Sequence, residues 1–253
     1  MLIKSLWTAL SAYSVIPVPQ YEWDDNATKY SICFFPLVGV VCGIGLAVWL
    51  LICRALSMGG LLFAAGATVL PLLITGGIHM DGYMDTVDAL ASHQPKERKL
   101  EIMKDPHCGA FAVIYCGVYL ISMLGVFSEL YTKKAIPVIL IGFALSRALS
   151  GLCAVNLPNA RKSGMLASIT MNIQKRNTNI VLILCALAAC TGMVWVNPMA
   201  GAGSILLSLL WLWCYRGIAM KQFGGVTGDT SGYFLQVCEL MLMIGALAGG
   251  RLQ

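Results

Sequence analysis

Long apolar runs that carry almost no charge are the feature that most constrains this chain. Only 11% of its 253 residues are charged, whereas an ordinary soluble domain carries about 25%. The runs are continuous and do not alternate with polar residues, as the strands of a membrane β-barrel would. The sequence therefore predicts an all-α, polytopic membrane helical bundle, with residues 1–253 forming a single integral-membrane domain.

We expect about seven transmembrane spans. Several apolar runs are shorter than the roughly 20 residues of a full crossing. The ends of the spans are therefore open, and their number is open to within one span. Residues 1–19 are apolar but short and contain Pro17 and Pro19, which favours an N-terminal interfacial or re-entrant helix over a cleaved signal peptide. The expected spans lie near 33–53, 61–75, 110–127, 135–155, 180–196, 203–215 and 233–249.

The basic residues predict the orientation of these spans, because cytoplasmic loops carry an excess of Lys and Arg. If residues 75–109 are cytoplasmic, seven alternating spans put twelve basic residues inside and four outside: Lys4, Lys29, Lys96, Arg98, Lys99, Lys104, Arg161, Lys162, Lys175, Arg176, Arg216 and Lys221 against Arg54, Lys133, Lys134 and Arg251. The same topology brings the polar loops 76–108, 157–179 and 216–232 to one face. We therefore expect a site built from several loops that faces the cytoplasm.

Half of the twelve carboxylates fall within residues 75–109, and they repeat at helical spacing. One set follows i, i+4, i+7 and the other i, i+4, i+8, so each set would share one face of a short cytoplasmic helix. Like charges at these spacings repel, and hard divalent cations such as Mg²⁺ bind carboxylate oxygens. An acidic metal site is favoured over a solvated loop, because no basic residue lies within the first set. The sets are Asp81, Asp85 and Asp88, and Glu97, Glu101 and Asp105.

Two further polar features have both a structural and a functional interpretation. Arg147 lies within a predicted span, where it either pairs with a carboxylate of a neighbouring helix, such as Glu239, or contacts phosphate in a polar cavity. Residues 223–232 contain four glycines before the last span. They indicate either an anion-binding loop at a helix N-terminus or a turn with Thr230 or Asp229 as N-cap.

Other site classes find no support in the sequence. The ten cysteines form no CxxC pair and join no histidine at zinc spacing, so they are typical of small core residues. No basic stripe with interleaved aromatic residues occurs, and we expect no nucleic-acid partner. Clustered glycines such as Gly39, Gly43 and Gly45 would permit close helix packing, which leaves a homo-oligomer open.

Three separated motifs resemble one known family. TGGIHMDGYMDTVDAL, LEIMKDPHCGAF and GGVTGDTSG, in this order, are similar to the signature blocks of cobalamin synthases, the adenosylcobinamide-GDP ribazoletransferases. The likeness extends to VIPVP near the N-terminus, to Ser146-Arg147 and to Cys238-Glu239-Leu240, and so spans nearly the whole chain. Ala89, where the family more usually has glycine, and residues 233–236 depart from the pattern without removing a candidate ligand.

The resemblance implies a transferase of the inner membrane that acts at the last step of cobamide nucleotide-loop assembly. It would join adenosylcobinamide-GDP to α-ribazole, or to its 5′-phosphate, and release GMP, with Mg²⁺ as the expected metal. On this interpretation the metal ligands are Asp81, Asp85, Asp88, Glu101 and Asp105, with Asp81 or Asp105 as the catalytic base. The substrate-binding candidates are His79, Lys104, Arg147, Gly225, Thr227 and Asp229.

Two other classes of function remain as alternatives. A CDP-alcohol-type lipid phosphotransferase would use similar carboxylates and metal but would not recognise a corrinoid. A multi-span transporter with an acidic cation site would account for Arg147 and Glu239, yet not for six carboxylates gathered outside the midplane. Because a corrinoid is too large to be buried in a chain of this length, we expect an open cavity on the cytoplasmic face.

Overall fold

The computed structural model describes residues 2–19, 28–131 and 134–251, and these form a bundle of helices with no strand. Six helices are each long and apolar enough to cross a membrane, and α4 (Gly60–Thr75) joined to α5 (Ile78–Ala91) makes a bent seventh candidate. The six are α3 (Phe35–Ala55), α7 (Ala110–Leu130), α8 (Ile136–Asn156), α10 (Lys175–Val196), α11 (Pro198–Ile218) and α12 (Gly228–Gly250). The prediction of an all-α polytopic bundle is confirmed.

Two predicted spans were too short. The apolar runs 180–196 and 203–215 belong to α10 and α11, which are longer because their ends carry polar residues such as Lys175 and Arg216. Only Asn197 separates the two helices. Its side chain accepts a hydrogen bond from the Ala200 N–H at 2.9 Å, and Pro198 opens α11 at a position where proline is tolerated.

The break between α4 and α5 directs the acidic helix away from the bundle axis. Gly76 and Gly77 have φ angles of +64° and +77°, a left-handed conformation that glycine adopts without steric cost. The two helices therefore meet at a bend of 96°. The N–H of Val15 donates to the Ile74 carbonyl at 2.9 Å, so the segment after α1 (Leu2–Tyr13) is bonded to the end of α4.

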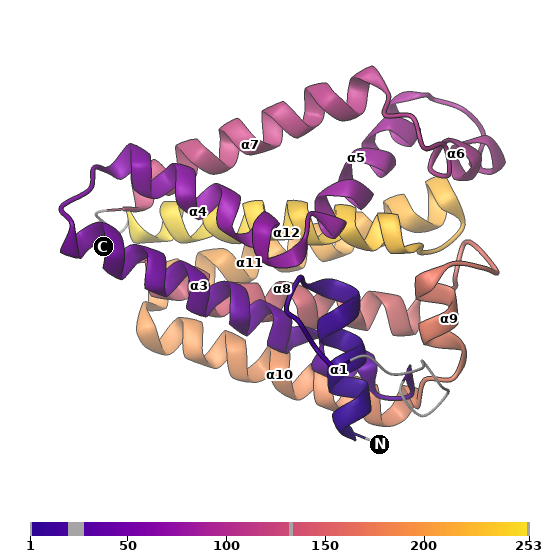
Figure 1. The fold of residues 1–253 in the computed structure, drawn as a ribbon, viewed down its shortest axis with the longest axis horizontal. Helices are drawn as coiled ribbons and strands as arrows, with labels where there is room; N and C mark the ends of the chain where they lie inside the picture. Colours follow the sequence, from indigo (N-terminus) through magenta and orange to yellow (C-terminus); the bar gives the residue numbers. More distant parts are fainter. Residues whose placement is uncertain (1, 20–27, 132–133, 252–253) are drawn as a thin grey trace.

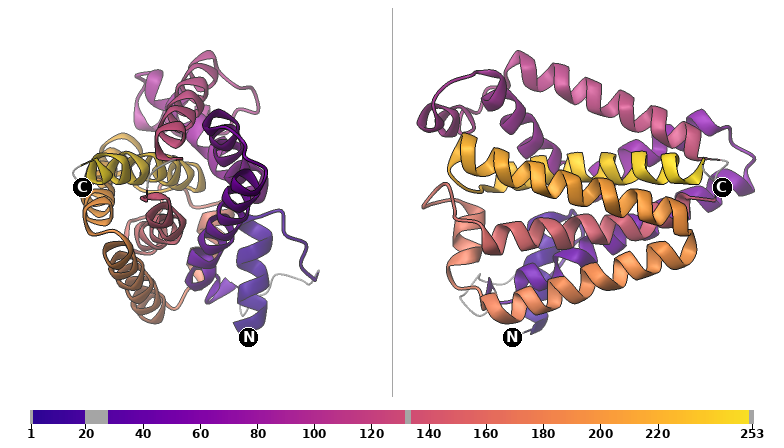
Figure 2. Two further views of the ribbon diagram at one scale, coloured as in Figure 1. Left: turned by 90° about the vertical axis from the view of Figure 1, so that its left-hand side faces the viewer. Right: turned by 180° about the vertical axis from the view of Figure 1, so that it is seen from behind.

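α8 and α12 lie at the centre of the bundle, whereas α7 and α10 expose most of their surface. Figure 2 shows α11 running beside α12, where Gly203 and Gly245 face each other so closely that neither has room for a Cβ atom. Gly39 and Gly43 pack in the same way against α8, and Gly45 packs against α4. These three glycines thus contact helices of the same chain. The homo-oligomer that they would permit stays a prediction.

A buried ion pair joins the two central helices. The Arg147 guanidinium of α8 bonds the Glu239 carboxylate of α12, and both side chains are at most 3% exposed. Arg147 also donates to the Phe143 carbonyl and the Ser146 hydroxyl, at 3.2 and 3.1 Å. Of the two interpretations of Arg147, the structure shows the ion pair.

One end of the bundle gathers the polar connections. α6 (Lys96–Ile102), α9 (Met165–Met171) and the start of α12 lie together at the right of Figure 1. The opposite end holds the end of α3, the start of α8 and the C-terminus. The prediction that three polar loops share one face is therefore confirmed, and we call this end the polar-loop face.

Candidate active site

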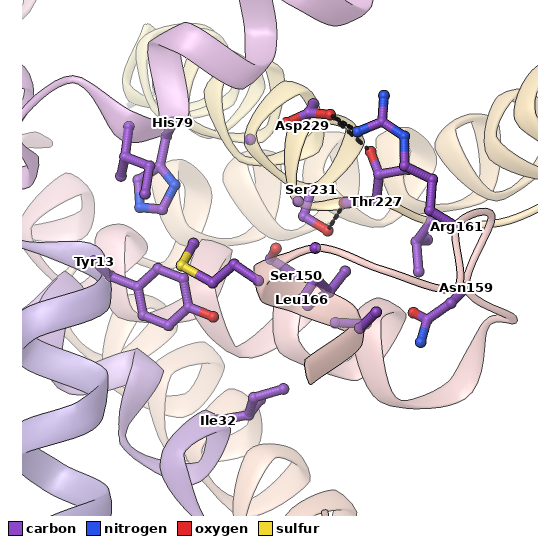
Figure 3. Close-up of a pocket in the computed structure, with 18 of the residues that line it drawn as sticks. Tyr13, Ile32, His79, Ser150, Asn159, Arg161, Leu166, Thr227, Asp229 and Ser231 are labelled. Carbon is purple, nitrogen blue, oxygen red and sulfur yellow. Dashed lines mark hydrogen bonds and ion pairs between the residues drawn. The ribbon is translucent and has the colours of Figure 1, made fainter. Parts of the chain in front are cut away.

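A cavity of about 320 Å³ lies beneath the polar-loop face, among α1, α5, α8, α9 and the N-terminus of α12. Figure 3 shows Tyr13 and His79 on one side of it, with Thr227, Asp229 and Arg161 on the other. Apolar side chains such as Ile32 and Leu166 complete the wall. This volume is at the lower end of the roughly 300–1,000 Å³ of small-molecule pockets.

The glycine loop before α12 is a structural connection whose backbone donors are already bonded. Gly225 N–H donates to the Ala219 carbonyl at 3.1 Å, and Val226 N–H donates to the Pro158 carbonyl at 2.8 Å. Gly225 packs so closely against Pro158 that a Cβ atom would collide with its carbonyl oxygen. This loop thereby fixes the segment containing Arg161 beside α12.

Thr227 is the N-cap of α12, so the expectation of Thr230 or Asp229 at this position was wrong. The Thr230 N–H donates to the Thr227 hydroxyl at 3.1 Å, and the Thr227 N–H donates to the Thr230 hydroxyl at 2.8 Å. This reciprocal capping box satisfies two donors of the helix end. It leaves the Asp229 carboxylate, in the first turn, available to face the cavity.

Asp229 forms an ion pair with Arg161 across the cavity rim. Arg161 Nη1 lies 2.9 Å from Asp229 Oδ2, and Nη2 donates to the Leu100 carbonyl at 2.9 Å. Both side chains are largely buried, at 17% and 25% exposure. The Nε of Arg161 is buried without a protein partner, so its N–H is left for another acceptor.

The acidic helix faces this ion pair. Asp81, Asp85 and Asp88 lie on α5, as their spacing predicted. Asp85 is repelled by Asp81, Asp88 and Asp229, whereas Arg161 is the cation that attracts it. Gly82 packs on the backbone of Asp229, and this close contact brings α5 and α12 together. Four carboxylates from two helices therefore lie near one another and near the Arg161 guanidinium.

This region fits a hard divalent cation in its chemistry, because carboxylate oxygens are the ligands that Mg²⁺ prefers. In the part of the chain that the structure describes, however, no three His, Cys, Asp or Glu side chains are close enough together to hold a metal ion. Binding would require the Asp81, Asp85 and Asp88 side chains to turn toward a common point. The Mg²⁺ site stays a prediction.

Glu101 and Asp105 are engaged elsewhere. Glu101 bonds Arg98 at 2.7 Å, with both side chains 62% exposed. α6 ends at Ile102, so the predicted i, i+8 repeat does not continue to Asp105 on one helix. Pro106 follows Asp105, and a proline disfavours helical geometry in the residue before it. Hydrogen bonds from the backbone N–H and ring of His107 lower the pKa of Asp105, which makes it a weaker base.

His79 carries an unsatisfied nitrogen at the opposite wall. Its ring lies 6.1 Å from that of Tyr13 and 5.7 Å from that of Phe35, measured between centroids. The side chain is buried, with 6% exposure, and Nε2 has no hydrogen-bond partner in the protein. A buried polar atom without a partner is costly, which indicates that a ligand or water bonds it.

The structure thus divides the predicted site residues into two groups. His79, Asp81, Thr227 and Asp229 line the cavity, and Asp85 and Asp88 continue along the same helix. The predicted residues absent from the cavity lining are Asp85, Asp88, Glu101, Lys104, Asp105, Arg147 and Gly225. Tyr13, Asn159 and Ser231 line the cavity although they were not among the predicted site residues. Arg161 was expected only as one of four basic residues of loop 157–179, which favour anionic lipid over a phosphorylated substrate as the ligand.

Comparison with known proteins identifies the family of this chain. The profile of the cobalamin-5-phosphate synthase family matches residues 5–247. The adenosylcobinamide-GDP ribazoletransferase of Lachnoclostridium phytofermentans is 46% identical, over 94% of this chain and 91% of that protein. Proteins of the same name from Clostridium perfringens strain 13 and Desulfitobacterium hafniense are each 31% identical over 96% of this chain, with 98% and 96% of their own lengths covered. No solved structure matches the chain. The chain belongs to the cobalamin-5-phosphate synthase family.

Proposed function

We propose that this protein is the membrane transferase that joins adenosylcobinamide-GDP to α-ribazole or its 5′-phosphate. The products are adenosylcobalamin, or its phosphate, and GMP. The family match and the names of its relatives support this activity. The observation that carries the assignment within the structure is the carboxylate region of α5 and α12 beside a cavity of small-molecule size.

The reaction is a phosphoryl-type transfer with one bond formed and one broken. A ribose hydroxyl oxygen of α-ribazole forms a bond to the phosphorus attached to cobinamide, and the bond from that phosphorus to the GMP oxygen breaks. The hydroxyl proton must pass to a base, and the departing GMP carries the negative charge. This chemistry depends on positioning and charge neutralisation more than on covalent catalysis by the protein.

We assign Asp81, Asp85 and Asp88 as the residues that would hold Mg²⁺, with Asp229 beside them. When bound, the metal would neutralise the pyrophosphate oxygens. Asp81 is the preferred base of the two candidates, because it lines the cavity and Asp105 lies exposed against His107. Arg161 has a free Nε donor beside the same carboxylates, which suits a phosphate oxygen.

We further propose that the site faces the cytoplasm across the inner membrane. The polar-loop face carries the basic residues of α6, the loop containing Arg161 and the start of α10. At the opposite end, the described basic residues are Arg54, Lys134 and Arg251; Lys133 lies outside the described residues. An excess of Lys and Arg on one side is typical of the cytoplasmic side.

Turnover by purified protein in lipid nanodiscs tests the activity directly. Adenosylcobinamide-GDP, α-ribazole and Mg²⁺ are supplied, and the products are identified by mass. We expect adenosylcobalamin and GMP in equal amounts, and loss of both when EDTA replaces Mg²⁺. A folded preparation that forms neither product, but releases CMP from a CDP-alcohol and an alcohol acceptor, would instead support the lipid phosphotransferase.

A further inference from the structure

The cavity has two chemically different ends. One end is aromatic, formed by Tyr13 of α1, Phe35 of α3 and His79 of α5. The other end is polar and charged, formed by Arg161, Thr227, Asp229 and Ser231 (Figure 3). A ligand that fills the cavity should therefore join a flat ring to a polyhydroxyl or phosphorylated group, which is the composition of a nucleoside.

The volume decides which part of the reaction this cavity can hold. A space of about 320 Å³ can accept a nucleoside. A corrinoid carrying a nucleotide is several times larger, so its macrocycle must lie outside. Two nucleosides take part in the proposed reaction, the α-ribazole acceptor and the guanosine of the leaving group, and the walls distinguish between them.

The aromatic end offers few polar groups. The described polar side chains at this end are the imidazole of His79 and the hydroxyl of Tyr13, beside apolar neighbours such as Ile32. Guanine presents several donors and acceptors along its edge, and each would need a partner when buried. The benzimidazole of α-ribazole has one free ring nitrogen, which a single imidazole N–H can satisfy. The unpartnered Nε2 of His79 matches this need.

The polar end continues into the carboxylate region. Asp81 lines the cavity and lies near enough to Asp229 to repel its carboxylate, and Thr227 and Ser231 add hydroxyl groups at the start of α12. A base held against Tyr13 and His79 would extend its ribose toward this end and so toward Asp81. That orientation puts the attacking hydroxyl beside the proposed base and the phosphate-binding carboxylates.

We infer that this cavity is the binding site for the α-ribazole acceptor, with its base against Tyr13 and His79 and its ribose toward Asp81, Thr227 and Arg161. The corrinoid and guanosine remain outside, toward the polar-loop face. This inference rests on the proposed function for the identity of the acceptor. Tyr13 is the residue through which it is tested, because no step of the chemistry is assigned to it.

The test measures binding and turnover separately. Equilibrium binding of α-ribazole to nanodisc protein is followed without the corrinoid substrate, and KM is then determined for each substrate. Stacking of a base on an aromatic ring contributes about 1–3 kcal/mol, so we expect Tyr13→Ala to raise the Kd and KM for α-ribazole roughly tenfold or more. The KM for adenosylcobinamide-GDP should change less than about twofold, a difference too small to reflect a lost stacking contact.

Two further variants make the result specific. Tyr13→Phe retains the ring and should bind α-ribazole nearly as the natural protein does. Tyr115→Ala removes an exposed tyrosine of α7 outside the cavity and should leave both KM values unchanged. A Tyr13→Ala variant whose KM rises only for adenosylcobinamide-GDP would overturn the inference and assign the cavity to guanosine.

The binding measurement distinguishes failure of this inference from failure of the proposed function. If the protein binds α-ribazole through Tyr13 but forms no adenosylcobalamin with any corrinoid substrate, the proposed reaction fails and the cavity assignment stands. If it forms adenosylcobalamin but Tyr13→Ala leaves α-ribazole binding unchanged, the cavity assignment fails and the reaction stands.

Discussion

At the scale of single residues, the site depends on carboxylates that repel one another. Asp85 lies in the field of Asp81, Asp88 and Asp229, with Arg161 as the cation that offsets them. Asp229 is itself bonded to Arg161 at 2.9 Å. An arrangement with this excess of negative charge is destabilising by itself and becomes favourable when a divalent cation binds. Clustered charge of this kind is typical of a functional site.

Asparagine at Asp85 or Asp88 removes a negative charge and nearly preserves the side-chain shape. If these residues hold Mg²⁺, turnover should fall roughly 100-fold or more, because the charge neutralisation of the transition state is weakened. The initial rate of GMP release in nanodiscs measures the effect, at saturating concentrations of both substrates.

Glu129→Gln is the matched control for the Asp85 and Asp88 variants. Glu129 pairs with Arg251 at the end of the bundle opposite the site, with both side chains more than half exposed. This variant should retain turnover within about twofold, since exposed ion pairs contribute little. Full activity of Asp85→Asn would refute the assignment of Asp85 to the metal.

At the scale of helices, two features position the site. The glycine pair after α4 turns α5 by 96° so that its acidic face meets the start of α12. The Arg147–Glu239 ion pair fixes α8 against α12 in the interior of the bundle. The first feature is a matter of backbone conformation and the second of buried charge, so they are tested by different substitutions.

Gly77→Ala tests the backbone requirement at the bend. A Cβ at Gly77 meets no atom within 4 Å, so the cost comes only from its φ of +77°. Alanine in the left-handed region costs about 1–2 kcal/mol, and we expect that loss in the free energy of unfolding in detergent. Gly117→Ala in α7 is the control, because its Cβ also meets nothing and its helical φ suits alanine. Equal stability of the two variants would contradict the argument.

A double-mutant cycle tests the buried pair. Arg147→Met alone leaves Glu239 buried without a partner, which should lower the free energy of unfolding by roughly 3–5 kcal/mol. Adding Glu239→Met removes the second charge and should recover most of that loss. The cycle is measured by denaturant unfolding of the detergent-solubilised protein. A double variant less stable than either single variant would show that the pair contributes net stability.

At the scale of the whole molecule, the two ends of the bundle differ in shape and charge. Helices α6 and α9, the start of α12 and most of the polar connections lie at one end (Figure 1). The cavity lies beneath that end, formed by segments from residue 13 to residue 232. The proposed topology therefore requires that every segment of the site is accessible from the same side of the membrane.

Cys108 provides a direct test of sidedness. It is an exposed cysteine in the connection between α6 and α7, on the polar-loop face. A membrane-impermeant maleimide should label it in inverted membrane vesicles and not in intact spheroplasts. Cys108→Ser should abolish the labelling, and Ser128→Cys in that background should be labelled only from outside, because Ser128 lies near the opposite end of α7. The reversed pattern would overturn the cytoplasmic assignment.

The membrane class, the helical character of each apolar run and the acidic face of α5 could all be predicted from the amino-acid sequence. These properties depend on local composition and spacing, which a helix preserves. The Gly76-Gly77 pair also indicates a bend after α4, because glycine adopts the left-handed conformation without steric cost. Two alternatives remained for Arg147, because a lone charge within a span indicates that it has a partner but does not identify that partner.

Which polar residues meet in space became known from the packing of the helices. It brought Arg161, which lies in a loop between α8 and α9, to Asp229, and it added Tyr13 from the first helix to the cavity wall. It left Glu101 and Asp105 outside, because α6 ends before Asp105 and their carboxylates bond Arg98 and His107. Spacing along one helix predicts which side chains share a face. The contacts between segments far apart in the chain depend on how the helices pack, and short motifs do not encode that packing.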